Sequence, residues 1–481
     1  MQSTELIALL PLIVIGAASV ALLGIIALRR NHALAAGFTA AALLAAIACL
    51  APAQFVAPRR GPLFVVDGYG LFFVGLILVA GLLIACLAYG YFERRGARQE
   101  EFYVLLLLAV AGSGLLAVSS HFVSLFLCLE LLSVSLYALI AYPRLRTDCV
   151  EAGVKYLVLG SASAAFLLFG AALAYAQLGS MELSQLSQAL SRAATSSDVI
   201  LLAGVGLVFV GAAFKLGVVP FHLWAPDVYQ GSSAPVGALI ATVSKASMAA
   251  LVFRYFASGT ALAESHLLQA VALVSAASML VGNLLALLQT NLKRLLAYSS
   301  ISHLGYVLVA LLSSAEDGRE AAAFYMAAYV ATLVAAFGVM AALSDGEADA
   351  EDLERYRGLF WRRPGLGFVL TLAMLSLAGI PLTAGFVGKF YILLAGAERA
   401  LWTLVLILAA ASVIALYYYL RVVVLIYSDA PAPRAAQAEA TTGSAALSLA
   451  LGGSAAAILF LGLFPERLMA YLRAAVSRFV S

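Results

Sequence analysis

Four of the five lysines in this sequence lie inside long apolar stretches instead of in polar loops. These are Lys155, Lys215, Lys245 and Lys389, whereas Lys293 begins such a stretch. A lysine that is removed from water can release its proton near neutral pH, whereas arginine keeps its charge in proteins. The 23 arginines accordingly lie almost entirely at the ends of apolar stretches or in loops. The lysine pattern therefore predicts proton-carrying chemistry in an apolar interior.

One acidic residue, Glu130 in FLCLELLSV, lies as deep in an apolar stretch as these lysines. A charge at the centre of a bilayer costs at least ~2.5–3.5 kcal/mol on insertion scales, so it needs a partner or a function. We expect Glu130 to pair with Lys215 across neighbouring helices. A static ion pair would only fix the register of two helices. On the functional interpretation, the carboxylate modulates how tightly Lys215 holds its proton.

A polar cluster in another apolar stretch includes His303, Tyr298 and Ser302. Histidine and hydroxyl groups inside a membrane helix can hold a water wire for protons, although they can also serve as ordinary hydrogen bonds between helices. His222 and Asp227 follow the stretch that contains Lys215, and both are candidates for a supporting role.

Two of the apolar stretches are interrupted in a similar way. The breaking residues are Gly217 and Pro220 after Lys215, and Gly379, Pro381 and Gly385 before Lys389. Glycine and proline free backbone carbonyls, which a membrane helix tolerates where they line a wet cavity. Broken helices at matching positions in two halves of a transporter indicate inverted repeats with ion sites at the breaks.

The composition defines the class of protein that must position these residues. Of 481 residues, 64% are hydrophobic and 11% are charged, and the mean hydropathy is +1.02. A soluble domain is about half apolar and about a quarter charged, so a soluble enzyme is excluded. The apolar runs are continuous, which also excludes a β-barrel. What remains is an all-α polytopic membrane protein.

Other classes of site find no support. The net charge of +3 is too small for a nucleic-acid surface. The four cysteines form no CxxC pair, so zinc, iron–sulfur and haem sites are not indicated. No P-loop or GxGxxG motif opens a nucleotide-binding unit. We therefore expect no metal and no cofactor bound by this chain.

Apolar stretches of about 20 residues predict about fourteen membrane helices in one integral membrane domain, 1–481. The predicted spans are 6–28, 33–51, 71–92, 102–119, 121–142, 151–177, 199–219, 235–257, 267–288, 293–313, 320–343, 366–397, 400–427 and 444–464. Three helices occupy 1–101, a five-helix repeat occupies 102–257 with its break near 217–222, a second occupies 267–427 with its break near 379–388, and 444–464 is the last helix. The broken helix is the fourth in each repeat. The largest polar inserts are 179–198 and 344–365.

Basic residues in loops orient such a bundle, because cytoplasmic loops are enriched in them. With the N-terminus outside, fourteen lie on cytoplasmic loops and nine on outer loops. We therefore expect both termini on the outer side.

The segments PFHLWAPDVYQGSSAPV (220–236) and NLKRLLAYSSISHLGY (291–306), together with the motif around Lys389, resemble a known family. They are similar to signature segments of the antiporter-like, proton-pumping membrane subunits of respiratory complex I, and most of all to subunit N of the bacterial NADH:quinone oxidoreductase. The resemblance covers nearly the whole chain. The family's subunit M has a glutamate where Lys389 stands, and the residues after 464 are too few for the lateral helix of subunit L.

The resemblance implies roles for the matching positions. Glu130 and Lys215 would be the coupled acid and lysine. Lys245 would connect the two halves, and His303 would be a bridging relay. Lys389 would be the terminal lysine facing the exit half-channel.

The resemblance also implies partners. The chain would be a non-redox subunit of an NADH:quinone oxidoreductase of the proton-translocating class, in the bacterial inner membrane with periplasmic termini. NADH, FMN, iron–sulfur clusters and quinone would bind to partner subunits, which include further antiporter-like subunits. An alternative is a subunit of a multisubunit sodium/proton antiporter, which shares the fold. A structural scaffold is a third possibility, and it predicts that loss of the lysines leaves activity intact.

Overall fold

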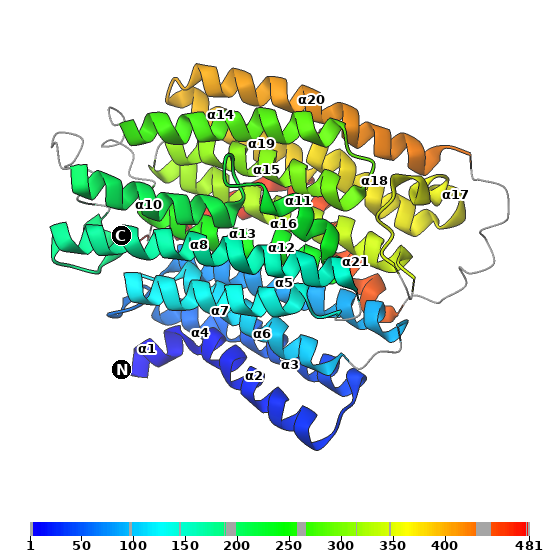
Figure 1. The fold of residues 1–481 in the computed structure, drawn as a ribbon, viewed down its shortest axis with the longest axis horizontal. Helices are drawn as coiled ribbons and strands as arrows, with labels where there is room; N and C mark the ends of the chain where they lie inside the picture. Colours follow the sequence, from blue (N-terminus) through cyan, green and yellow to red (C-terminus); the bar gives the residue numbers. More distant parts are fainter. Residues whose placement is uncertain are drawn as a thin grey trace.

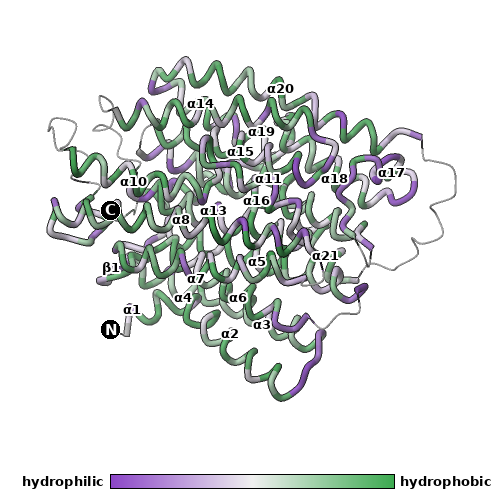
Figure 2. Tube along the Cα trace, in the orientation of Figure 1, coloured by the Kyte–Doolittle hydropathy of each residue, from purple (hydrophilic) through white to green (hydrophobic). Residues whose placement is uncertain are grey.

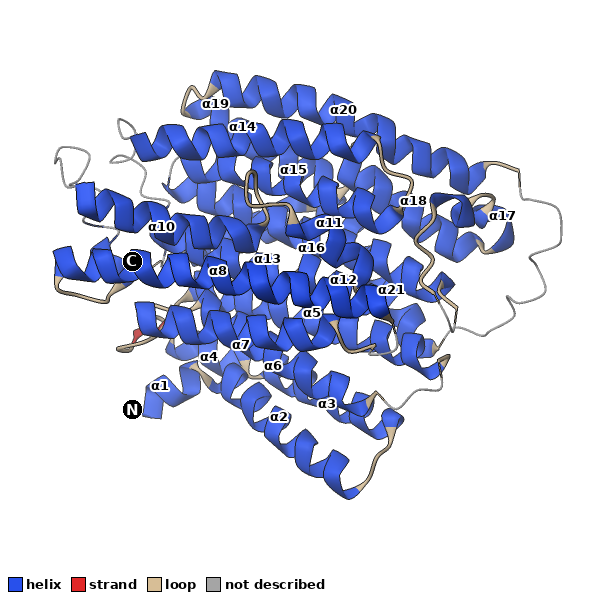
Figure 3. Cartoon of the chain, viewed as in Figure 1, coloured by secondary structure: helices blue, strands red, loops and turns tan. Residues whose placement is uncertain are grey.

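The chain folds into a bundle of helices that lie side by side with nearly parallel axes (Figure 1). The structure is a computed structural model that describes residues 3–95, 99–143, 146–186, 188, 199–256, 266–313, 315–345, 348–429, 444–477 and 479. In this part of the chain the only sheet is one short antiparallel pair, β1 (Arg59–Arg60) and β2 (Val65–Val66), so the protein is all-α as predicted (Figure 3). Much of the insert 179–198 and the counted arginines Arg98, Arg144, Arg192, Arg434 and Arg478 lie outside the described residues.

The first helices lead from one edge of the bundle to its centre. They are α1 (Ser3–Ala8), α2 (Leu10–Leu28), α3 (His32–Ala48), α4 (Leu50–Val56) and α5 (Gly68–Glu93). The last of them, α5, contacts α12 (Ala234–Ala241), α13 (Val243–Phe256) and α16 (Ala315–Leu343) at the centre. The side chain of Asp67 accepts a hydrogen bond from Gly70 N and so caps α5, which is the longest of these helices.

The first predicted repeat consists of five membrane crossings. They are α6 (Glu100–Ala117), α7 (Phe122–Ile140), α8 (Thr147–Leu178), α10 (Val199–Leu216) with α11 (Trp224–Gly231), and α12 (Ala234–Ala241) with α13 (Val243–Phe256). The fourth crossing is broken between α10 and α11, as predicted. The predicted boundary between the fourth and fifth spans also holds, because His121 Nδ1 accepts from Val123 N and caps α7.

The second predicted repeat has the same organisation. Its crossings are α14 (His266–Leu287), α15 (Leu292–Leu312), α16 (Ala315–Leu343), α18 (Pro364–Ala378) with α19 (Ala384–Glu398), and α20 (Trp402–Tyr427). A 3₁₀ turn, η1 (Leu353–Tyr356), and α17 (Leu359–Arg362) precede α18. The predicted last span, 444–464, is α21 (Ala445–Leu463), but it is followed by a further, amphipathic helix, α22 (Pro465–Ser477), which was not among the predicted helices.

The two sets of five share one pattern of neighbours. The first helix packs on the second in both (α6 on α7, α14 on α15), and the second packs on the third. The third helix contacts both halves of the broken fourth (α8 on α10 and α11, α16 on α18 and α19), and the first contacts the fifth. This is the arrangement expected of an internal repeat. Because five crossings are an odd number, the second set begins on the opposite side of the bundle from the first.

The described residues contain thirteen helices long and apolar enough to cross a membrane. The remaining predicted span, 366–397, is the broken pair α18 and α19, which has 15 residues in each half. At 1.5 Å per residue each half is about 22 Å long, so only the two together cross a bilayer. The chain is therefore a multi-pass membrane protein with about fourteen crossings, as the sequence predicts.

Both termini lie at one end of the bundle, and α17 lies at the other (Figure 1). We call these ends the termini side and the α17 side. Hydrophilic residues gather at the helix ends and around α17, while the middle of most helices is apolar (Figure 2). The most enclosed helices are α12, α13, α15 and α16, and every residue of α13 is buried. Lys245 and His303 lie on two of these central helices.

Candidate functional site: a row of lysines, tyrosines and a histidine

Lys215 lies at the end of the first half of the first broken helix. After α10 ends at Leu216, Gly217 has φ 75°, a left-handed conformation that favours glycine. The buried Lys215 Nζ donates to Ser133 Oγ on α7 at 2.8 Å and to Tyr156 Oη on α8 at 2.9 Å. Two neutral hydroxyl groups therefore hold this ammonium beside the break.

The expected direct pair between Glu130 and Lys215 is not formed in the described structure, which corrects the sequence-based guess. Glu130 precedes Ser133 by one turn of α7, so the serine hydroxyl occupies the position next to the lysine. Glu130 is half-buried and acts on Lys215 through space. The two residues belong to one electrostatic site without a shared hydrogen bond.

Lys245 is completely buried between the first break and α15. Its Nζ is hydrogen-bonded to Ser300 Oγ and lies 5.6 Å from the ring centroid of Tyr229 on α11. A Cβ added to Gly217 would lie 3.8 Å from the same Nζ. The glycine of the break therefore lies within contact distance of the central lysine.

Ser300 connects Lys245 to tyrosine hydroxyl groups. Its Oγ is bonded to Tyr329 Oη on α16 at 2.5 Å, and Tyr229 Oη donates to it at 3.3 Å. His303 follows Ser300 by three residues on α15, so the two side chains lie on one face of that helix.

His303 lies between tyrosines of two further helices. Its Nδ1 is bonded to Tyr325 Oη on α16 at 2.5 Å, and its Nε2 is bonded to Tyr419 Oη on α20 at 3.0 Å. The imidazole ring is also 5.6 Å from the ring of Tyr329. Both ring nitrogens therefore have a hydroxyl partner, which a proton relay through imidazole requires.

Lys389 lies at the second break, just after the start of α19. Its buried Nζ donates to the carbonyl oxygens of Leu377 at 2.8 Å and Ala378 at 3.1 Å, at the end of α18. The last carbonyls of a helix lack partners within the helix and carry partial negative charge. The Nζ also lies 5.3 Å from the ring centroid of Tyr306, one turn after His303 on α15.

Glycines and a proline shape the second break. Gly379 ends α18 with φ 84°, and Pro381 lies in the segment before α19. A Cβ on Gly385 would collide with the carbonyl of Ser376, so glycine is needed for this close approach. The Gly385 N donates to Ser376 Oγ at 3.2 Å.

We define the relay row as the groups that follow one another from the first break to the second. They are Lys215, Lys245, Ser300, Tyr329, His303, Tyr325, Tyr419, Tyr306 and Lys389. Sequence reasoning found the lysines and the histidine but missed the tyrosines and the role of Ser300. The spacing of Tyr325 and Tyr329, four residues apart in an apolar helix, is the signal that could have indicated them.

Two predicted supporting residues point elsewhere. Ser302 Oγ accepts from Asn283 Nδ2 on α14 at 2.8 Å, and Tyr298 is a half-buried residue packed at the edge of the core. His222 is buried in the first break, and its Nδ1 has no hydrogen-bond partner within the described chain.

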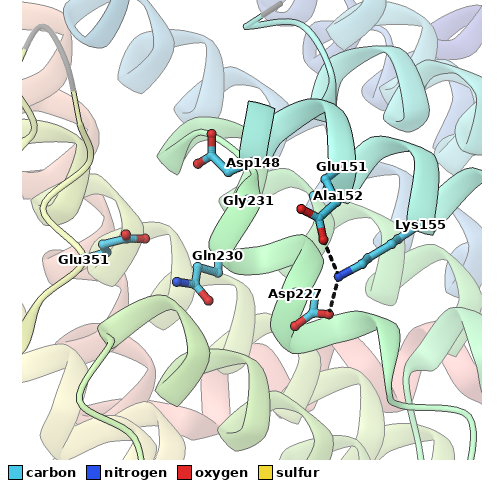
Figure 4. Close-up of a pocket in the computed structure, with 8 residues that line it drawn as sticks. All are labelled: Asp148, Glu151, Ala152, Lys155, Asp227, Gln230, Gly231 and Glu351. Carbon is cyan, nitrogen blue, oxygen red and sulfur yellow. Dashed lines mark hydrogen bonds and ion pairs between the residues drawn. The ribbon is translucent and has the colours of Figure 1, made fainter. Parts of the chain in front are cut away.

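Lys155 and Asp227 line a surface pocket of about 240 Å³ (Figure 4). Lys155 is 45% exposed and pairs with Glu151 at 2.7 Å and with Asp227 at 3.1 Å. Asp227 also pairs with Arg294 at 2.9 Å. Lys155 is therefore not one of the buried lysines. Lys293 is buried instead, because its side chain is 0% exposed.

The arrangement suits stepwise proton transfer, because hydroxyl groups and a histidine lie between the lysines of the two breaks. Between Lys215 and Lys245 the described residues provide no direct hydrogen bond, and the rings of Tyr156 and Trp224 pack there, 4.7 Å apart. Across the described ranges, no three histidine, cysteine or acidic residues cluster as a metal site would require.

Together, the broken helices and the buried lysines define an ion-translocating membrane protein of the antiporter-like class. The family described as "NADH:quinone oxidoreductase/Mrp antiporter, TM" matches residues 119–415. NADH-quinone oxidoreductase subunit N of Ectopseudomonas mendocina is 44% identical over 473 residues, which is 97% of this chain and 95% of that protein. The chain therefore belongs to the family of NADH-quinone oxidoreductase subunit N.

Solved structures agree with this fold. A chain of respiratory complex I from Thermus thermophilus with bound aureothin has a TM-score of 0.82 and 33% identity, and the match covers 97% of this chain and 100% of that one. The archaeal membrane-bound sulfane sulfur reductase (TM-score 0.83) and the Mrp complex from Dietzia (0.80) share the fold at 22% identity, with 100% of this chain and 98% of theirs covered.

Proposed function

We propose that this chain is the proton-translocating membrane subunit N of an NADH:quinone oxidoreductase, and that protons cross it along the relay row. The main observation is that three ammonium groups are buried in the bundle and hydrogen-bonded only to neutral groups in the described structure. A buried charge without a bonded counter-charge is expensive. Lysine can remove that cost by releasing its proton, and so it can alternate between two states.

The order of the groups suggests the route. Protons enter near Lys215 from the α17 side, which the charge bias assigns to the cytoplasm. They pass laterally through Lys245, Ser300 and His303 and leave near Lys389. Neutral imidazole can accept a proton at one nitrogen and release the other proton from the second, and each nitrogen of His303 has a tyrosine partner. Glu130 modulates the first step.

Driving energy comes from partner subunits of the same complex, which bind NADH, FMN, iron–sulfur clusters and quinone. This chain contributes no redox step. We place it in the bacterial inner membrane with both termini on the periplasmic side. The relatives named as parts of NADH:quinone oxidoreductase and respiratory complex I support the assignment to such a complex.

The test replaces Lys245 in the assembled complex and measures protons moved per electron in proteoliposomes. Lys245→Met removes the amine, whereas Lys245→Arg keeps a positive charge that cannot be released. We expect both variants to lower the ratio, and the exposed Lys155→Met to lower it less. A ratio restored by arginine would mean that Lys245 acts as a fixed charge, and the proposal would be wrong.

The same vesicles distinguish the antiporter alternative. A cation/proton antiporter moves protons when a sodium gradient is imposed without NADH and quinone, whereas a redox-driven subunit requires electron transfer. Unchanged pumping in both Lys245 variants and in Lys215→Met would favour a structural scaffold.

A further inference from the structure

Two ion pairs whose side chains are 0% exposed lie at opposite ends of α5. Arg254–Asp67 lies on the termini side, and Lys293–Asp349 lies on the α17 side. None of these residues belongs to the relay row. Both pairs nevertheless attach to helices of the row, because Arg254 lies on α13 with Lys245 and Lys293 lies on α15 with Ser300.

The pair on the termini side is bidentate. Arg254 donates to the two carboxylate oxygens of Asp67 at 2.7 and 2.8 Å. Asp67 also caps α5 through Gly70 N, at 2.7 Å. The guanidinium lies 5.3 Å from the ring of Tyr69 and 5.0 Å from that of Phe479. The pair thus joins the start of α5 to the end of α13, and the two aromatic rings pack against its guanidinium.

The pair on the α17 side binds four segments together. Lys293 Nζ donates to Asp349 Oδ2 at 2.6 Å and to the carbonyls of Ser232 at 2.7 Å and Gln230 at 3.1 Å. Asp349 Oδ1 accepts from Tyr91 Oη at 2.6 Å and from Arg95 at 3.1 Å, at the end of α5. The end of α11, the start of α15, the loop before η1 and the end of α5 therefore meet at this one ion pair.

This second pair lies where the surface pocket of Figure 4 ends. Gln230, Gly231 and Glu351 line the pocket, and Glu351 Oε2 is 4.0 Å from Lys293 Nζ. Lys293 binds the carbonyls on either side of Gly231. The pocket therefore ends at residues that contact the pair, while the ammonium and carboxylate themselves are completely covered.

The two pairs bracket Lys245 along the helices. Arg254 follows Lys245 by nine residues, or about 13 Å of helix, and Lys293 precedes Ser300 by seven residues, or about 10 Å. Apolar side chains of α12 and α13 fill the intervening layers, and every residue of these helices is buried. Lys245 is more completely buried than Lys215 and Lys389, the other two lysines of the row.

We propose that Arg254–Asp67 and Lys293–Asp349 are positioning pairs that close both ends of the Lys245 site, so that this lysine exchanges protons only sideways along the row. The proposal rests on the proposed function. A buried pair that loses one partner leaves an uncompensated charge, and such a charge draws in water. Removing either carboxylate should therefore connect Lys245 to one aqueous phase.

The experiment measures passive proton conductance of the intact complex in liposomes, with a pH gradient imposed and no NADH. Asp67→Asn keeps a capping residue of equal size, and Asp349→Asn keeps an acceptor for Tyr91. We expect each variant to raise the proton conductance roughly tenfold. Such an increase corresponds to a barrier to proton transfer that is lower by about 1.4 kcal/mol. The matched controls are Glu182→Gln and Asp345→Asn, which break the exposed pairs Arg60–Glu182 and Arg355–Asp345 and should leave the conductance unchanged.

The double variant Asp349→Asn/Lys245→Met shows whether the leak uses the central lysine. We expect it to return to the wild-type conductance, because the leak path ends at Lys245. A leak that persists without Lys245 would reveal general loosening and overturn the proposal, as would wild-type conductance in both single variants. If Asp349→Asn fails to assemble, Tyr91→Phe removes one hydrogen bond to Asp349 and should give a smaller leak. If Asp67→Asn and Asp349→Asn keep the wild-type proton conductance while Lys245→Met still loses pumping, the two pairs do not close the Lys245 site. The proposed function would then remain.

Discussion

Gly379 and Lys389 meet across the second break, where a Cβ on the glycine would lie 3.1 Å from Lys389 Cδ and 3.3 Å from its Nζ. The first break repeats the relationship more loosely, since a Cβ on Gly217 would lie 3.8 Å from Lys245 Nζ. Each break therefore combines a left-handed glycine with an ammonium group. The glycine ends the helix at both breaks, and at the second break it also leaves the space that Lys389 occupies.

Gly379→Ala should damage both stability and transport. The left-handed conformation costs a residue with a Cβ roughly 1–2 kcal/mol, and the methyl group would push Lys389 away from the carbonyls of α18. We expect a lower thermal unfolding temperature and fewer protons per electron. The control Gly365→Ala, in the first turn of α18, has no atom within 4 Å of the new Cβ and should be neutral or slightly stabilising. Equal behaviour of the two variants would contradict this account of the break.

Ser300 and Ser302 offer a comparison within one helix. Ser300→Ala removes the hydroxyl between Lys245 and Tyr329, so we expect a large loss of protons per electron. Ser302→Ala removes a hydrogen bond to Asn283, which costs about 0.5–1.5 kcal/mol, and should affect pumping less. Pumping assays and thermal unfolding on the same preparations check both effects. Asn283 Nδ2 also donates to Tyr306 Oη at 3.3 Å. A greater pumping loss in Ser302→Ala than in Ser300→Ala would therefore mean that protons pass through Ser302 and Asn283 instead of Ser300.

Tyr325→Phe tests the hydroxyl partners of His303. It removes the group bonded to Nδ1 and leaves a buried nitrogen unsatisfied, at a cost of about 1–3 kcal/mol. We expect slower proton transfer with unchanged assembly of the complex, measured as protons per electron at matched subunit content. Tyr391→Phe, a half-buried neighbour on α19 that contacts Phe324, serves as the control. Normal pumping in Tyr325→Phe would remove this tyrosine from the row.

We expect acid to destabilise the loop that contains Asp349. Burial raises the pKa of this carboxyl, but Lys293 and then Arg95 outweigh burial and hold the pKa below its ordinary value of about 3.9. The folded state thus binds fewer protons here than the unfolded state. Its stabilising effect is complete above about pH 3.9 and is lost as the pH falls through the lower folded pKa.

Hydrogen exchange of residues 348–358 followed by mass spectrometry measures this effect. In the wild type we expect faster exchange, after correction for intrinsic rates, on acidification below about pH 3.9. In Asp349→Asn the segment should already exchange faster at neutral pH and show no further acid step. The exposed Asp345→Asn should behave like the wild type. An acid step that persists in Asp349→Asn would assign it to another carboxyl.

Most of the fold could be predicted from the sequence because apolar length alone determines a membrane crossing. The breaks at Gly217 and Gly379 were predictable for a similar reason, since glycine and proline act on their own backbone. The exact helix ends were less predictable: the break in 366–397 was expected near 379–388, whereas α18 ends at Ala378 and α19 already begins at Ala384. Which helices occupy the centre could not be predicted, because lipid-facing and buried helices are equally apolar.

The site was harder to predict because side-chain direction depends on packing. Ser300 and Ser302 are only two residues apart, yet one faces Lys245 and the other Asn283, since successive helical positions point about 100° apart. Hydropathy likewise placed Lys155 inside a span without showing that it faces the surface. The distant partner of Lys293, Asp349, comes from a polar loop 56 residues away, and no local pattern connects them.

The relay row runs across the helices instead of along them. Its residues come from α10, α13, α15, α16, α19 and α20, which lie beside one another (Figure 1). An elementary charge that traverses a membrane potential of 100 mV gains or loses about 2.3 kcal/mol, but a charge that moves parallel to the bilayer plane crosses none of it. On the proposed function, lateral hops between the two breaks are therefore insensitive to voltage. The whole electrical work of the proposed transport then falls on the entry step at one end of the row and the release step at the other.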